Sequence, residues 1–170
     1  MTPKLKIWTD NVQDQCFLES ILRHQSYSDA IEFDNGKGGT SLLSIGSSSI
    51  LVAPERPIAL VMNAGTDDPA EIADLRRIIK GNIPWGTWVA AIAVPNVDAW
   101  ALADLRIERI FSDAPYLALG RYKRAVAMKE LTKTEPFDVD AIRRINDDFR
   151  RLDDFLALHA GTSATVATRS

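Results

Sequence analysis

Short apolar runs alternate along the chain with segments in which apolar residues recur at helical spacing. The clearest run covers residues 57–62, which are nearly all apolar and are followed at once by a polar, acidic turn at 63–69. A continuous apolar run of this length is typical of a strand buried on both faces in a parallel sheet. Other runs predict further strands at 5–8, 30–33 and 87–94.

Segments with helical periodicity follow these strands. The segment 69–80 carries acids at its amino end and bases at its carboxyl end, which is the order that the helix dipole favours. Residues 106–120 are mixed in character and receive no assignment. The predicted helices cover 11–24, a segment that begins near Thr40, 69–80, 97–105, 121–133 and 139–159.

Strands that alternate with helices predict a parallel α/β sheet with right-handed crossovers. We therefore expect a Rossmann-like sheet of about four parallel strands, flanked by helices, with further helices at the carboxyl end. No internal repeat or linker divides the chain. A single domain over 1–160 is expected, followed by a loose polar tail at 161–170.

The composition narrows the classes of function. A net charge of -3 argues against non-specific, charge-driven binding to nucleic acid, although a local basic patch could still serve. The lone Cys16 excludes an internal disulfide and favours a reducing, cytoplasmic setting. Together with His24 and His159, it is too small a set for a structural zinc site. No stretch is apolar and long enough to span a bilayer, and none resembles a signal peptide, so no membrane partner is expected.

Acidic and amide side chains follow the predicted strands. Asp10 comes after the first strand, Asn63 and Asp67 after the third, and Asp98 just beyond the fourth. The carboxyl ends of parallel strands meet at one edge, so these oxygen-bearing groups could hold Mg²⁺, which could then polarise a phosphate and activate water. The alternative is structural: Asp10 and Asp98 cap helices, and Asp67 and Asp68 solvate a turn.

Three stretches at strand ends suggest a family. Residues 10–17 read Asp-Asn-Val-Gln-Asp-Gln-Cys-Phe, residues 63–65 read Asn-Ala-Gly, and residues 95–100 read Pro-Asn-Val-Asp-Ala-Trp. In this order they resemble the Toprim domain, the metal-binding fold of topoisomerases, primases and overcoming-lysogenization-defect nucleases. The likeness covers roughly residues 4–105 and is greatest to small stand-alone Toprim-like proteins of bacteria and their viruses.

The resemblance implies a magnesium-dependent nuclease that acts on nucleic-acid phosphodiesters, DNA among them, in a setting such as phage defence. Asp10 would be a metal ligand or general acid/base. Asn63 and Asp67 would be ligands, and Asp98 a catalytic carboxylate that binds the metal or supports a ligand.

The chain also departs from the family pattern. The first strand of the family ends in glutamate, usually followed by glycine, and Asp10-Asn11 stands there instead. A middle strand ends in Asp-x-Asp in the family, whereas Asn63 and Gly65 stand here, with no charge and no side chain respectively. Losing two charged ligands weakens the attraction for Mg²⁺. A catalytically inactive binding or regulatory subunit, whose charged helix at 139–159 docks a protein partner, is therefore the alternative.

Two further stretches of the sequence could bind phosphate groups. Lys37 lies in the glycine-rich stretch 34–41, where backbone N–H groups could approach a phosphate, although the P-loop pattern is absent. A nucleotide-binding flavodoxin-like domain would use the same loop, and a plain turn before a helix is the structural alternative. Arg121, Lys123 and Arg124 could contact a nucleic-acid backbone, or form the solvated face of a helix. Nucleic acid, a protein partner and a second copy of the chain all stay open as partners.

Overall fold

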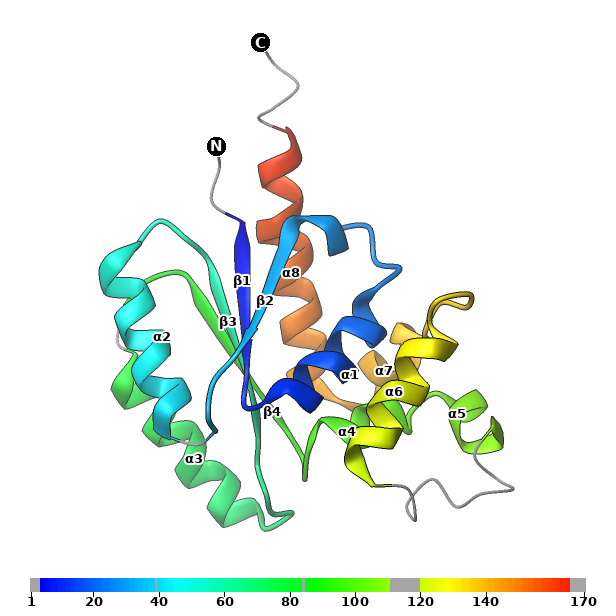
Figure 1. The fold of residues 1–170 in the computed structure, drawn as a ribbon. Coiled ribbons are helices and arrows are strands. Elements are labelled where there is room, and N and C mark those ends of the chain that lie inside the picture. The colour runs from blue at the N-terminus through cyan, green and yellow to red at the C-terminus, as the bar shows by residue number, and fades with distance from the viewer. Residues whose placement is uncertain (1–3, 39, 84, 111–119, 166–170) are drawn as a thin grey trace.

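A four-stranded, all-parallel sheet lies at the centre of the molecule, in the order β2-β1-β3-β4 (Figure 1). The computed structural model describes residues 4–38, 40–83, 85–110 and 120–165. The predicted α/β fold with four parallel strands and carboxyl-terminal helices is confirmed, and every strand lies within two residues of its predicted bounds. The strands are β1 (Leu5–Thr9), β2 (Ile31–Asn35), β3 (Ile58–Asn63) and β4 (Trp88–Ala93).

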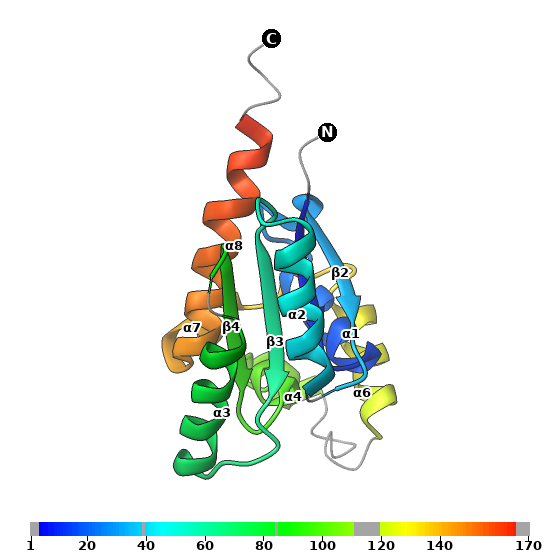
Figure 2. The ribbon, with the colours of Figure 1, turned by 90° about the vertical axis from the view of Figure 1, so that its left-hand side faces the viewer.

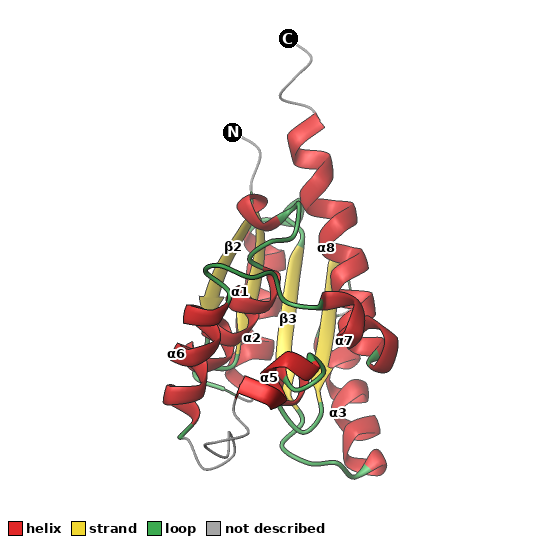
Figure 3. Ribbon diagram, turned by 90° about the vertical axis from the view of Figure 1, so that its right-hand side faces the viewer, coloured by secondary structure: helices red, strands yellow, loops and turns green. Residues whose placement is uncertain are grey.

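Helices cover both faces of the sheet. On one face lie α2 (Thr40–Val52) and α3 (Pro69–Asn82), as Figure 2 shows. On the other face lie α1 (Val12–Leu22) and α8 (Asp147–Thr165), which Figure 3 shows. Each face has its own apolar core.

The central strand β3 contributes to both cores. Its residues from Ile58 to Met62 are all buried, because β3 lies between β1 and β4 and beneath helices on both faces. Ile58 and Leu60 belong to the core under α2 and α3, whereas Ala59 and Val61 belong to the core under α1 and α8. A strand with two buried faces needs an unbroken apolar run, which is why the sequence pattern located it.

Four further helices lie beyond the sheet on the α1 side. They are α4 (Val97–Ala101), α5 (Leu105–Ile110), α6 (Arg121–Leu131) and α7 (Val139–Ile145), and a short 3-10 turn, η1 (Ser28–Ala30), precedes β2. Both α4 and α6 contact α1. The buried Trp100 of α4 meets Phe149 of α8 edge to face, with 5.2 Å between ring centroids. These contacts hold α4 and α6 close to the carboxyl end of β1.

Two segments predicted as single helices are each divided. The segment 97–105 contains α4 and the start of α5, and α5 includes residues 106–110, which had no assignment. The segment 139–159 breaks at Asn146, whose backbone is extended and whose side-chain oxygen accepts the N–H of Phe149 at 2.9 Å. Asn146 thereby caps the amino end of α8.

The break at Asn146 changes which side chains are buried. Ile145 is apolar and ends α7 directly before the break, and it is 73% exposed. After the break, α8 continues to Thr165, into the segment predicted as a tail. Residues 166–170 of that tail, and 111–119 of the unassigned run, lie outside the described residues.

The strand order reverses between β1 and β3. From β1 the chain passes through α1 to β2 on one side, and then returns through α2 to β3 on the other side of β1. Ligands of open α/β sheets bind outside the carboxyl ends of the strands at such a switch point. The fold therefore directs attention to the residues that follow Thr9 and Asn63.

Candidate functional site

Asp10 joins the two strands at the switch point. Its Oδ2 accepts the backbone N–H of Asn63 at 2.8 Å, and the residue is buried. It does not cap α1, as the structural alternative had it. Asn11 has that role, because its Oδ1 accepts the N–H of Asp14 at 2.9 Å.

Both polar atoms of the Asn63 side-chain amide form hydrogen bonds. Its Nδ2 donates to Asp14 Oδ2 at 2.6 Å, and its Oδ1 accepts the backbone N–H of Val97 at 2.9 Å. The side chain thus links β3 to α1 and to the start of α4. An aspartate here could not donate, and it would set a second negative charge against Asp14.

Asp14 is the most deeply buried carboxylate of the site, with 0% exposure. Its Oδ2 accepts from Asn63 and, at 3.0 Å, from Asn11 Nδ2, while its Oδ1 pairs with Arg121. Burial raises its pKa from 3.8 to about 6, against the lowering effects of the Arg121 charge and the Asn63 hydrogen bond. The negative charges of nearby Asp10 and Asp98 contribute to this rise.

Two arginines of α6 reach into the site. Arg121 pairs with Asp14 and also donates from Nε to Asp98 Oδ1 at 3.2 Å. Arg124 pairs with the other oxygen of Asp98. Asp98 is buried within α4, so this helix and α1 are both tied to α6 through charge. We call Asp10, Asp14, Asp98, Arg121 and Arg124 the strand-end cluster.

Other predicted residues lie on the surface. Asp67 is exposed in the turn before α3, where Asp68 caps the helix by accepting the N–H of Ala70 at 2.8 Å. Lys37 is exposed between β2 and α2, and Lys123 on α6. In the described part of the chain, no contact joins these side chains to the strand-end cluster. Of the three bases predicted on α6, Lys123 faces solvent, whereas Arg121 and Arg124 turn inward. Contact of these bases with a nucleic acid stays a prediction.

Sequence reasoning left Asp14 out of the candidate residues. The signal that could have found it is its position one helical turn after Asp10, where the Toprim pattern has an aspartate. The roles of Arg121 and Arg124 carried no local signal, because their partners lie far away in the chain. Arg121 and Asp14 are separated by 107 positions.

The strand-end cluster does not offer Mg²⁺ a free set of ligands. Both oxygens of Asp14 and both oxygens of Asp98 are already engaged, and two cationic groups lie beside them. Mg²⁺ requires carboxylate and water oxygens in near-octahedral order. Over residues 4–38, 40–83, 85–110 and 120–165, no three acid, histidine or cysteine side chains are grouped so that they could hold a metal ion. Magnesium binding stays a prediction from the sequence.

Comparisons of the chain with protein-family models, with curated proteins and with solved structures find no match. The fold is therefore shown only as a four-stranded parallel α/β sheet, and no family is identified. None of the helices in the described residues is long and apolar enough to cross a membrane.

Proposed function

We propose that the chain is a Toprim-like domain that has lost metal chemistry and acts as a binding or regulatory subunit. The observation that carries this proposal is the pairing of Arg121 and Arg124 with Asp14 and Asp98. In the family, a divalent cation supplies positive charge among the strand-end acids. Here the two guanidinium groups supply it, and each holds a carboxylate by charge-assisted hydrogen bonds.

The two departures from the family pattern support the same proposal. Asn63 donates a hydrogen bond to Asp14, which an aspartate could not do. Gly65 has a positive φ of 68° and provides no side-chain ligand atom. Asn63 and Gly65 therefore suit a site whose carboxylates are held by arginines of the protein. They suit a metal site less well, because neither adds a carboxylate.

A magnesium-dependent nuclease is the second candidate, and one observation favours it. Three carboxylates, Asp10, Asp14 and Asp98, lie so close together at this edge that the charges of Asp10 and Asp98 raise the pKa of Asp14. In this candidate Arg121 and Arg124 release the carboxylates and face the phosphates of a nucleic acid. Asp10 and Asp98 would then be the catalytic carboxylates.

The helical segment at 139–159 is a weaker docking surface than its charge pattern indicates. Arg143 pairs with Asp153 at 2.6 Å and with Asp154 at 2.8 Å, and Arg150 pairs with Asp147 at 2.7 Å. A partner would meet a segment in which most charged side chains are already paired, so electrostatic attraction would add little to its binding.

The experiment is a calorimetric titration of Mg²⁺ and Mn²⁺ into the full chain, followed by a nuclease assay on DNA and RNA at millimolar metal. We expect neither binding nor cleavage by the parent chain. The double variant Asn63→Asp, Gly65→Asp is expected to gain metal binding. Gly81→Asp with Asn82→Asp is the matched control, because it adds two carboxylates to the exposed end of α3. Saturable Mg²⁺ binding by the parent chain that Asp10→Asn abolishes would favour the nuclease instead.

A further inference from the structure

Strand β4 lies at one edge of the sheet, where only β3 pairs with it. The carbonyl of Thr87 accepts the N–H of Ile58 at 3.1 Å, and the carbonyl of Ala93 accepts the N–H of Ala64 at 2.9 Å. Backbone groups alternate in direction along a strand. The odd-numbered residues of this strand therefore point their backbone groups toward β3, and the even-numbered residues point theirs away from the sheet.

The outward groups belong to Trp88, Ala90 and Ile92. The N–H of Ile92 donates to Asp148 Oδ2 at 2.8 Å, which both confirms the direction and closes this end of the edge. No hydrogen bond from another described residue reaches the outward N–H and C=O groups of Trp88 and Ala90. The first half of β4 thus presents an unpaired strand edge.

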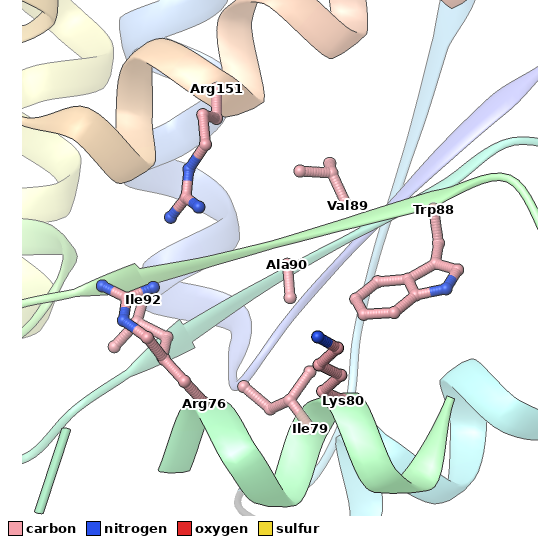
Figure 4. A pocket seen from close by; sticks show the side chains of 8 residues that line it. All are labelled: Arg76, Ile79, Lys80, Trp88, Val89, Ala90, Ile92 and Arg151. Carbon is pink, nitrogen blue, oxygen red and sulfur yellow. The ribbon is translucent and has the colours of Figure 1, made fainter. Parts of the chain in front are cut away.

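A cavity of about 310 Å³ runs along this open edge, between α3 and α8 (Figure 4). Trp88 and Ala90 form part of its floor, Arg76 and Lys80 line it from α3, and Arg151 lines it from α8. We call this cavity the β4 groove. Its walls are helices on opposite faces of the sheet, so its long direction follows the strand.

The β4 groove carries an excess of positive charge. Arg76 contacts Asp148 through two hydrogen bonds of 2.9 and 2.7 Å, and Arg151 contacts the same carboxylate at 2.9 Å. Asp148 therefore neutralises one of these two arginines. Lys80 is exposed, and no acid in the described residues forms an ion pair with it. Three cationic side chains against one carboxylate leave two positive charges in the groove.

We propose that β4 binds an extended acidic segment of a partner protein as an additional strand. The backbone of that segment would pair with the outward groups of Trp88 and Ala90, and its carboxylates would face Arg76 and Lys80. In strand addition, main-chain hydrogen bonds provide affinity and the side chains beside the edge provide specificity. This inference rests on the edge geometry and stands whether or not the strand-end cluster is catalytic.

Other occupants fit fewer of these features. The β4 edge of a second copy would bring the same cations and would be repelled. A nucleic acid would satisfy the charges but would leave the outward backbone groups of Trp88 and Ala90 without a matching row of donors and acceptors. An acidic extended peptide satisfies both.

The test uses the full chain and a fluorescein-labelled peptide of alternating glutamate and valine, followed by fluorescence anisotropy. We expect saturable binding that weakens as salt is added, and no binding of the corresponding lysine–valine peptide. Lys80→Glu should weaken binding about tenfold, because one exposed attraction is lost and one repulsion is gained. Lys129→Glu makes the same change in the last turn of α6, away from the groove, and should leave affinity within about twofold.

The backbone contribution is tested separately. A glutamate–valine peptide in which alternate amides are N-methylated keeps its charge but cannot form the strand pairing, and should not bind. Ala90→Pro removes one outward N–H from an edge position where proline is tolerated, and should also abolish binding. Equal binding of the methylated peptide, or no effect of Lys80→Glu, would overturn the proposal. So would a dimer of the chain that Lys80→Glu dissociates, or tighter binding of an oligothymidine at the same groove.

Discussion

Replacing Asp14 by asparagine tests the electrostatics of the strand-end cluster. Asp14 is fully buried, and its pKa is raised from 3.8 to about 6. A carboxyl group whose pKa is higher in the folded than in the unfolded chain stabilises the fold while it is protonated. That stabilisation is complete below about pH 4 and is lost as the pH rises through 6. The difference of about two pH units corresponds to about 3 kcal/mol of unfolding free energy.

Asparagine at position 14 cannot ionise, so the Asp14→Asn variant does not lose this stabilisation as the pH rises. The unfolding free energy of the variant, minus that of the parent chain, should therefore rise between pH 4 and pH 7 by up to about 3 kcal/mol. Urea unfolding followed by tryptophan fluorescence and circular dichroism at several pH values measures the difference. Asp67→Asn makes the same chemical change in an exposed turn, and controls for the general effect of removing one negative charge. A difference for Asp14→Asn that is flat or falls with pH would refute the reasoning.

Three further variants test other contacts, each by urea unfolding. Arg121→Ala leaves the buried Asp14 without its cation and should lower the unfolding free energy by about 2–4 kcal/mol at pH 7. The loss should be smaller at pH 5, where Asp14 binds a proton, and an equal loss at both pH values would contradict this. Trp100→Ala removes a fully buried ring and its contact with Phe149, and should cost about 3–5 kcal/mol, whereas a loss under about 1 kcal/mol would argue against that packing. Asn146→Ala removes the cap of α8 and should cost about 1 kcal/mol; Asn146→Asp, which retains the capping oxygen, should recover most of it.

The sheet could be predicted from the sequence because its signals are local. The apolar run at 57–62 reflects burial of β3 on both faces, and the polar turn after it marks the end of the strand. Alternation of strand and helix patterns then gave the parallel architecture. The helix break at Asn146 escaped prediction, because asparagine is tolerated within helices and the apolar spacing continued across it. Its capping hydrogen bond to Phe149 is visible only in three dimensions.

The sequence predicted the acidic and amide residues of the candidate site, apart from Asp14, but not its arginines. Asp10, Asn63 and Asp98 were expected to meet because parallel strands end at one edge, and the hydrogen bonds of Asp10 and Asn63 do join β1, β3 and α4. The arginines escaped prediction as members of the cluster. Whether the bases of α6 face solvent or the sheet depends on how α6 packs on α1, and no local pattern encodes that packing.

The most direct test of the central claim is a crystal structure of the parent chain grown with millimolar Mn²⁺, examined for anomalous scattering. We expect that Arg121 still contacts Asp14 and Asp98, that Arg124 still contacts Asp98, and that no anomalous peak lies among the carboxylates. An anomalous peak coordinated by Asp10, Asp14 or Asp98, with the arginines turned away, would contradict the account and favour the nuclease.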